Sequence, residues 1–560
     1  MAASCGTTVL ATSTFKWNAL SLLSCVSCCT LVLVSLSPAT ADETGAIPAP
    51  ENHGATISKA GDLYVSAVRT GAGEIFTKHD DNLLDAINRA CELAGEGKQG
   101  KHALIEILTK GSCGSKQRER GRRHGIVPLS YQTLDFHHNE YQVVAGPSTS
   151  KFMYGFCFGR ASTINKREPD VKAPRTHVTI RNFRLSGNPK AAFDIYYCDH
   201  ITIENLDLDI DLDQGKGINF RKGSFLDIRG DIYIRGGSSH GMDIVGSSNV
   251  TIGDVTVTHT KEGCGVLLST NHNVKIGNVF GYKNEPQGSY ATMRFANGNA
   301  NAEVQGVYSR SSGKGIMVSS GEAGWQYRPA EGGWPTPGNH NNVVFKADIL
   351  RTHGANVFMN APSSHNEVSY AALREAAKNK GGGLTMIKGP KNRVGENILP
   401  PVVIDPSRME TVRINELRFG FNDCSPVGDF DVDRTDKYIR DRSCDGYGYA
   451  KPAEAKGSEI SWTINGGRGR HQLKWRYHSE HDLSASLYIN DALSEKVVFK
   501  GARTEAEWQT TAATLENVDK GRKLIKLVAT TNDGLPLIDF LEVTGPGVQA
   551  SLFDLETAEN

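Results

Sequence analysis

Charged or polar residues occupy the same position in four of six short, similar segments in the middle of the chain. The segments are AFDIY (192–196), GINFR (217–221), GMDIV (241–245), GVLLS (265–269), TMRFA (292–296) and GIMVS (315–319). Because side chains alternate between the two faces of a strand, the third residue of each segment points away from its two apolar neighbours. We call these third residues the outward column: Asp194, Asn219, Asp243, Leu267, Arg294 and Met317.

A second set of residues precedes each segment and lies beside the outward column: Lys216, His240, Cys264, Ala291 and Lys314, with Tyr290 next to it. If successive segments stack like neighbouring strands, Asp194 and Asp243 lie about 10 Å apart. Two such carboxyl groups suit general acid–base chemistry, whereas basic side chains stabilise negative charge that develops in a reaction. A carboxylate such as Asp243 would also hold the charge and orientation of the His240 imidazole.

The residues whose side chains could take part in a reaction are therefore expected on one face of the sheet. The candidate catalytic residues are Asp194, His240, Asp243, Tyr290, Arg294 and Lys314, and Asn219 is a candidate substrate contact.

The elements that position these residues form a repeat of mostly 23 to 27 residues between about 175 and 395. Each unit has an apolar strand, an Asn, Ser or Gly turn and a second strand, as in HITIENLDL and SNVTIGDVTV. This period predicts a right-handed parallel β-helix. Before it, Asp80-Asp81-Asn82 and the apolar spacing from Leu83 predict a helix that caps the open end, and 102–108 predicts a strand. Residues 42–78 are expected to have irregular structure.

A Pro-rich stretch at 395–408 ends the repeat, and alternating strands follow it. These strands are expected at 458–464, 471–478, 484–490, 523–529 and 537–543, and their alternation predicts an antiparallel β-sandwich of the jelly-roll kind. The sequence thus predicts an all-β chain, with a β-helix domain over 42–400 and a sandwich over 408–546.

In the form of its repeat, the first domain resembles the pectin-lyase-like β-helix superfamily of pectate lyases, alginate lyases, polygalacturonases and other glycosidases. The Asn-Thr-Asp, Asp-Asp and Arg-Ile-Lys set of polygalacturonases is absent. The resemblance implies an enzyme that degrades polysaccharide. A lyase acting by β-elimination on a uronic-acid polymer would use Arg294, Lys314, His240 and Tyr290, and we favour it because basic groups cluster on this face. The alternatives are a hydrolase using Asp194 and Asp243, and a non-catalytic surface protein that binds carbohydrate.

The second domain resembles carbohydrate-binding modules of families 6, 35 and 36. The matching runs are GYGYA (446–450), SEISWTI, HQLKWRYH, SLYIND, EAEWQTT (505–511), LENVDKGRKLIKL (515–527) and LIDFLEV. The resemblance implies that Trp508 and either Tyr447 or Tyr449 stack on sugars. It also implies a structural Ca²⁺ held by Glu416 and Asp539. We add Trp325 and Trp334, from an insertion at 321–340 of the repeat, as further candidate sugar contacts.

The N-terminus predicts export. Lys16 precedes an apolar stretch, Leu20 to Leu36, that ends in an A-x-A site before Asp42, so residues 1–41 are a predicted signal peptide. The alternative is a retained membrane anchor. Lys+Arg and Asp+Glu are both 62, and this zero net charge argues against a nucleic-acid partner. We expect a secreted, extracellular monomer with polysaccharide as its partner and no membrane partner once the signal is removed.

Seven of the 11 cysteines lie outside the predicted signal, and an odd number in an exported protein leaves at least one free thiol. Cys424 and Cys444 flank a polar loop and form the best candidate disulfide. Cys198 and Cys264 lie in apolar strands and are expected to be buried thiols.

Overall fold

The structure is a computed structural model of the 560-residue chain. It describes residues 50–113, 124–144, 153–159, 174–211, 213, 215–285, 287–319, 338–360, 362–376, 384–395, 407–415, 424–427, 438–439, 449–450, 455–502 and 508–550. The predicted signal peptide and Cys444 lie outside these residues. Within them, no helix is both long enough and apolar enough to cross a membrane. The predicted fold class, an all-β chain with a parallel β-helix and a β-sandwich, is confirmed.

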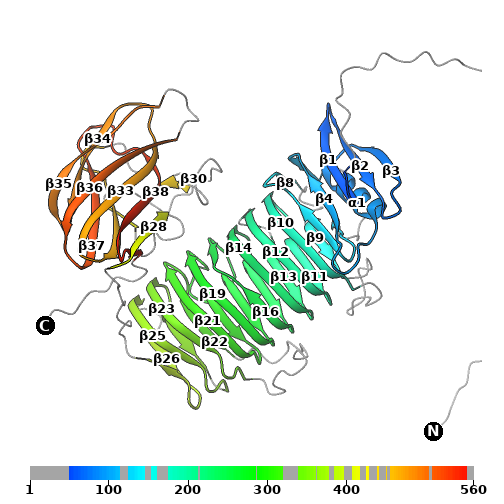
Figure 1. Ribbon diagram of the computed structural model, residues 1–560. Coiled ribbons are helices and arrows are strands. Elements are labelled where there is room, and N and C mark those ends of the chain that lie inside the picture. The colour runs from blue at the N-terminus through cyan, green and yellow to red at the C-terminus, as the bar shows by residue number, and fades with distance from the viewer. Residues whose placement is uncertain are drawn as a thin grey trace, which may run out of the picture. The chain divides into compact units, whose positions relative to one another are not determined.

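A helix and three strands form the start of the β-helix (Figure 1). The elements are β1 (Gly54–Ala60), β2 (Leu63–Arg69), β3 (Ile75–Asp80) and α1 (Leu83–Ala94). Helix α1 begins where the sequence predicted, because the Asn82 side chain accepts a hydrogen bond from the backbone N–H of Asp85. Its apolar face, including Leu84 and Ile87, is buried in the core of the β-helix, and each such side chain contributes about 2 kcal/mol.

The prediction of irregular structure over 42–78 is wrong for the described residues of this stretch. Strands β1, β2 and β3 form an antiparallel sheet, and β1 also pairs in parallel with β4, the first strand of the long-strand sheet. Strand β3 gave no signal in the sequence because it is almost entirely exposed and therefore lacks an alternating apolar pattern.

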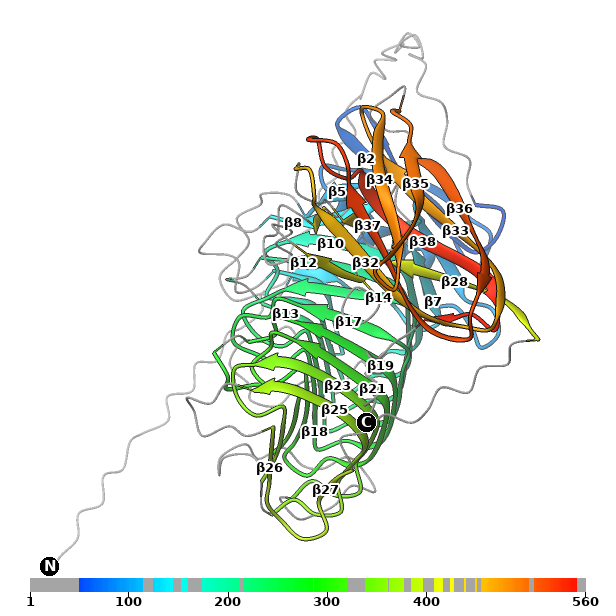
Figure 2. The same ribbon diagram turned by 90° about the vertical axis from the view of Figure 1, so that its left-hand side faces the viewer.

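Two parallel sheets run the length of the β-helix, and their strands stack coil upon coil (Figure 1, Figure 2). Within the described residues, the short-strand sheet has ten strands: β6 (His124–Ile126), β9 (Met153–Phe158), β11 (Ala191–Tyr196), β13 (Lys216–Arg221), β15 (Met242–Val245), β18 (Val266–Ser269), β20 (Met293–Ala296), β22 (Ile316–Ser319), β24 (Val357–Met359) and β26 (Thr385–Ile387). The coils therefore begin earlier than the predicted repeat, with β6 and β9.

The second parallel sheet of the β-helix is the long-strand sheet. Its parallel strands are β4 (Ala103–Ile107), β5 (Gly111–Ser112), β7 (Gln132–Asp135), β8 (Glu140–Val143), β10 (Thr176–Gly187), β12 (Asp199–Ile210), β14 (Ser224–Gly236), β16 (Ser248–Ile252), β17 (Val255–Thr258), β19 (His272–Tyr282), β21 (Ala300–Arg310), β23 (Val343–Thr352), β25 (Glu367–Ala376) and β27 (Arg393–Val394).

The register predicted from the alternation of residues is confirmed. Asp194 pairs with Asn219, Asn219 with Asp243, Asp243 with Leu267, Leu267 with Arg294, and Arg294 with Met317. The residues on either side of this outward column are buried in the core, as Ile218 and Phe220 are.

Glycine precedes many of the short strands because neighbouring backbone approaches it closely. A Cβ atom on Gly217 would lie 2.2 Å from the carbonyl oxygen of Gly241 in the next coil and 3.0 Å from Cγ2 of Ile234 in the core. The recurrent small residue of the repeat is therefore a packing requirement.

Buried asparagines connect successive coils at one turn. Asn342 accepts hydrogen bonds from Nδ2 of Asn299 at 2.8 Å and from the backbone N–H of Ala302 at 3.2 Å. Its own Nδ2 donates to Oδ1 of Asn366 at 2.8 Å and to the carbonyl oxygen of Asn299 at 3.0 Å. This ladder satisfies polar backbone groups that the turn would otherwise leave unpaired in the core.

Two antiparallel sheets form the C-terminal sandwich. One contains β28 (Met409–Asn415), β30 (Tyr438–Ile439), β31 (Tyr449–Ala450), β33 (Gly469–His478), β36 (Gln509–Val518) and β38 (Leu537–Pro546). The other contains β29 (Cys424–Val427), β32 (Glu459–Gly466), β34 (Leu483–Ile489), β35 (Ala492–Phe499), β37 (Gly521–Ala529) and β39 (Gln549–Ala550). The five predicted strands correspond to β32, β33, β34, β37 and β38. The core between the sheets includes Trp462 and Trp475.

Candidate functional site

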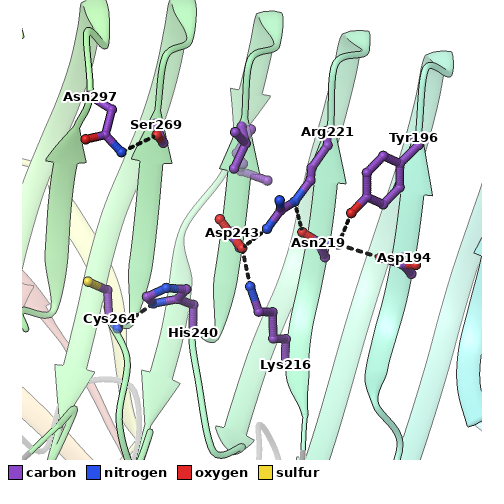
Figure 3. A network of polar contacts seen from close by, with 12 residues as sticks. Asp194, Tyr196, Lys216, Asn219, Arg221, His240, Asp243, Cys264, Ser269 and Asn297 are labelled. Carbon is purple, nitrogen blue, oxygen red and sulfur yellow. Dashed lines mark hydrogen bonds and ion pairs between the residues drawn. The ribbon is translucent and has the colours of Figure 1, made fainter. Parts of the chain in front are cut away.

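Asp243 is the centre of an ionic cluster on the outer face of the short-strand sheet (Figure 3). Its Oδ2 accepts hydrogen bonds from the Lys216 ammonium and, at 2.8 Å, from the Arg221 guanidinium. Asp243 is only 2% exposed. Burial alone would raise the pKa of Asp243, but the positive charges of Lys216 and Arg221 outweigh it and hold this pKa well below its usual value. The carboxylate is therefore ionised at neutral pH.

The remaining oxygen of Asp243 has a different environment. Within the described part of the chain, Oδ1 is buried and has no hydrogen-bond partner. A buried carboxylate oxygen is normally hydrogen-bonded, so the charge of Asp243 is balanced through Oδ2 alone by Lys216 and Arg221.

Asp194 and Asn219 continue the cluster across the next two strands, β11 and β13 (Figure 3). Nδ2 of Asn219 donates to Oδ1 of Asp194 and, at 3.3 Å, to the hydroxyl of Tyr196. Nε of Arg221 donates to Oδ1 of Asn219 at 2.6 Å. Asp194 and Asp243 are therefore linked through Asn219 and Arg221, and both carboxylates belong to one polar network.

His240 lies beside this network but does not pair with Asp243 as the sequence led us to expect. Its Nδ1 accepts a hydrogen bond of 2.8 Å from the backbone N–H of Cys264 (Figure 3). Burial, the main cause, lowers the pKa of His240 to about 4, although the Asp243 charge acts to raise it. The expectation of a charged imidazole held by Asp243 is wrong, because Asp243 is engaged by Lys216 and Arg221 and burial disfavours the charge. His240 is a neutral ring with its proton on Nε2.

Tyr290 and Arg294 form the next part of the face. The Arg294 guanidinium lies 5.3 Å from the centroid of the Tyr290 ring, and Nε of Arg294 donates to Oγ of Ser319 at 2.9 Å. The edge-to-face contact of Tyr290 with His240 has a centroid separation of 5.8 Å. Both Tyr290 and Arg294 are partly exposed.

Lys314 is bound mainly to the segment that carries Tyr290. Its ammonium donates to the carbonyl oxygens of Gly288 and, at 3.2 Å, of Ser289. The backbone N–H of Tyr290 in turn donates to Oε2 of the buried Glu285 at 2.7 Å. Glu285 and Lys314 thus fix the position of Tyr290.

The structure therefore brings together His240, Asp243, Asn219, Asp194, Tyr290, Arg294 and Lys314 on one face of the β-helix. Sequence reasoning missed Arg221, Tyr196 and Glu285 as members of this site. Arg221 and Tyr196 lie two residues after the outward column, where the period-2 alternation again turns the side chain outward, and this signal was present in the sequence.

In the sandwich, Trp508 is partly exposed and lies outside the core cluster. The Arg476 guanidinium lies 5.3 Å from its ring centroid, and the His478 ring lies 6.0 Å away. Asp539 is fully buried, and its carboxylate accepts a hydrogen bond from Arg476. Of the described residues, no group of three or more His, Cys, Asp or Glu side chains is arranged to hold a metal ion.

Several predicted site residues lie outside the described residues: Trp325, Trp334, Glu416 and Tyr447. Tyr449 lies in β31, but only its backbone is described. Calcium binding by Glu416 and Asp539 stays a prediction, as does the pairing of Cys424 with Cys444. Cys198 and Cys264 are free, buried thiols as predicted, and burial raises the pKa of each to about 11.

Comparison with known proteins gives similarity over part of the chain, and no protein-family model matches it. Endo-1,4-beta-xylanase B and alpha-L-arabinofuranosidase C of Cellvibrio japonicus (strain Ueda107) are each 34% identical over 110 residues, which is 19% of this chain and 18% of the relative. The chain thus spans less than a fifth of the length of these relatives.

Two solved structures are also similar to part of the chain. They are the CBM35 module from Cellvibrio japonicus Abf62 and Xyl-CBM35 in complex with a glucuronic acid containing disaccharide. Each is 28% identical with a TM-score of 0.22; they cover 25% of this chain and 98% and 97% of their own chains, respectively. Since each of these four similarities covers at most 25% of the chain, none of them extends over the length of the β-helix.

Proposed function

We propose that this protein is a secreted polysaccharide-degrading enzyme, and that its β-helix cleaves a uronic-acid-containing polysaccharide by β-elimination. The sandwich binds carbohydrate in this proposal. The named activities of the two curated relatives, a xylanase and an arabinofuranosidase, support a polysaccharide as the substrate.

The excess of basic side chains on the outer face is the observation that supports an acidic substrate. Four basic side chains lie there, Lys216, Arg221, Arg294 and Lys314, against the three carboxylates of Asp194, Asp243 and Glu285. Because Asp243 is already paired with two cations, the Arg294 end of the face keeps a positive charge. Such a charge attracts a substrate carboxylate and stabilises the negative charge that develops during elimination.

The side chains at Arg294 suit the steps of the reaction. Arg294 pairs with the uronate carboxylate, and this acidifies the proton on the adjacent ring carbon. Tyr290, whose ring lies beside the Arg294 guanidinium, takes this proton as a phenolate. The electron pair of the broken C–H bond forms a C=C bond while the bond between the next carbon and the glycosidic oxygen breaks. The tyrosine then returns the proton to the departing oxygen. No oxidant or water is consumed. The neutral His240 offers its Nε2–H as a hydrogen-bond donor.

Hydrolysis by Asp194 and Asp243 has less support from the geometry. An inverting hydrolase needs one carboxyl group that is protonated and able to donate its proton. Lys216 and Arg221 keep Asp243 ionised, so Asp194 would have to be the acid. Asp194 is only 4% exposed and accepts a hydrogen bond from Asn219, so a leaving group has little access to it.

The test is incubation of the full chain with polygalacturonate, alginate, glucuronoxylan and a neutral xylan. We expect the ultraviolet absorbance of an unsaturated uronate on at least one acidic polymer. Arg294→Ala should lower that rate by about 100-fold or more. The matched control is Lys275→Ala, which removes an exposed cation from the long-strand sheet. Reducing ends without the absorbance would indicate hydrolysis, and binding without cleavage would indicate a carbohydrate-binding protein.

A further inference from the structure

We propose that Phe358 forms a sugar-binding subsite of the β-helix, on which a ring of the polysaccharide stacks beside the Arg294 site. This inference rests on the proposed function, since it concerns the same substrate. Phe358 follows the insertion at 321–340 and was not among the residues chosen from the sequence.

Strand pairing places Phe358 in the outward column. Met317 pairs with Phe358, and Phe358 pairs with Met386 on the last strand of the sheet. The flanking residues Val357 and Met359 are buried in the core at 0% and 1% exposure, whereas Phe358 is partly exposed. The ring therefore points outward.

The side chains of the outward column change from polar to apolar along the sheet. Cys157, Asp194, Asn219 and Asp243 form a polar half, whereas Met317, Phe358 and Met386 form an apolar, partly exposed stretch beyond Arg294. In the described part of this column, Phe358 is the only aromatic residue. An aromatic ring flanked by two flexible methionines is suited to the apolar face of a sugar ring.

Phe358 is also linked to the proposed reactive site. It lies two strands from Arg294, which corresponds to about 10 Å. The Lys314 ammonium lies 5.8 Å from the centroid of its ring, and the same ammonium binds the carbonyl oxygens of Gly288 and Ser289 before Tyr290. One extended chain can therefore contact Tyr290, Arg294 and Phe358 together.

The experiment compares Phe358→Ala and Phe358→Trp in the full chain, with polygalacturonate, alginate and glucuronoxylan as probes. We expect Phe358→Ala to raise KM, or Kd where the polymer is bound but not cleaved, about tenfold, with little change in kcat. Phe358→Trp should retain affinity because it retains an aromatic face. The control Phe345→Ala removes a partly exposed phenylalanine from β23 of the other sheet, and melting curves verify folding of all variants.

The outcomes separate the two proposals. If wild type acts on or binds an acidic polymer and Phe358→Ala leaves KM and Kd unchanged, the subsite is overturned and the proposed function stands. If Phe358→Trp loses affinity as Phe358→Ala does, ring stacking is overturned. If wild type neither binds nor cleaves any acidic polymer, the proposed function fails and the subsite fails with it.

Discussion

The backbone N–H of Cys264 donates a hydrogen bond to Nδ1 of His240 across two adjacent coils. The bond requires the imidazole to be unprotonated at Nδ1, and burial lowers its pKa to about 4 from an ordinary value near 6.5. As the pH falls between these two values, the unfolded chain takes up a proton that the folded chain does not. The stability contributed by the neutral ring is therefore complete above about pH 6.5 and declines down to about pH 4.

We predict that His240→Gln reduces this pH dependence. The free energy of unfolding, measured with denaturant at pH 7.5 and pH 4.5, should fall less in the variant than in wild type. The difference is at most about 3 kcal/mol, the equivalent of the pKa shift. His200→Gln, which removes a surface imidazole on β12, is the control. An equal fall in wild type and His240→Gln would contradict the neutral, buried ring.

Asp243→Asn should destabilise the β-helix because it leaves Lys216 and Arg221 facing a buried group without charge. We expect a loss of about 3 kcal/mol in the free energy of unfolding at pH 7. The control is Asp213→Asn, whose carboxylate pairs with Lys261 at the surface and is 78% exposed, so its loss should cost less than about 1 kcal/mol. Similar effects of the two variants would show that the Asp243 cluster is not a buried ion pair.

The asparagine ladder predicts a contrast between two adjacent residues. Asn342→Ala removes four hydrogen bonds and leaves the polar groups of Asn299, Ala302 and Asn366 buried without this partner. We expect a loss of about 3 kcal/mol, measured by denaturant unfolding. The neighbouring Asn341 is exposed and has a φ of 54°, so Asn341→Gly should change stability little. Equal losses would argue that the ladder does not stabilise the coils.

Trp508→Ala should weaken carbohydrate binding by the sandwich. An aromatic ring outside the core provides a surface for a sugar ring, so we expect about a tenfold loss of affinity, or about 1.4 kcal/mol, in affinity electrophoresis of the full chain. Tyr488→Ala removes a partly exposed aromatic residue from β34 of the opposite sheet and serves as the control. A larger loss with Tyr488→Ala than with Trp508→Ala would place sugar binding on the other sheet.

Much of the fold could be predicted from the sequence because it depends on local periodicity. Alternation around Asn219 and Asp243 determines which face each strand buries, and the 23- to 27-residue period determines which strands pair. The exposed strand β3 lacked this signal and was missed. Phe358 was not chosen because the insertion before it interrupts the period, although its alternation is the same.

The chemistry of the site was less predictable, since it depends on contacts between coils. Lys216 and Asp243 are 27 residues apart, and their ion pair depends on how a flexible lysine crosses to the next strand. The neutral state of His240 depends on burial by its surroundings, which no local pattern reveals. Residue types on a face follow from the register, but their protonation states follow from packing.

The parallel stacking of the coils determines how the loss or duplication of a coil would alter the spacing of residues in the outward column. Each coil contributes one residue to the outward column, and neighbouring coils are about 4.8 Å apart. Loss or duplication of the coil between Asp243 and Arg294 would therefore change their spacing by one such step without turning either side chain. Duplication of the coil that contains Leu267 would separate the two residues by three steps instead of two, and the length of sugar chain that contacts both would change accordingly.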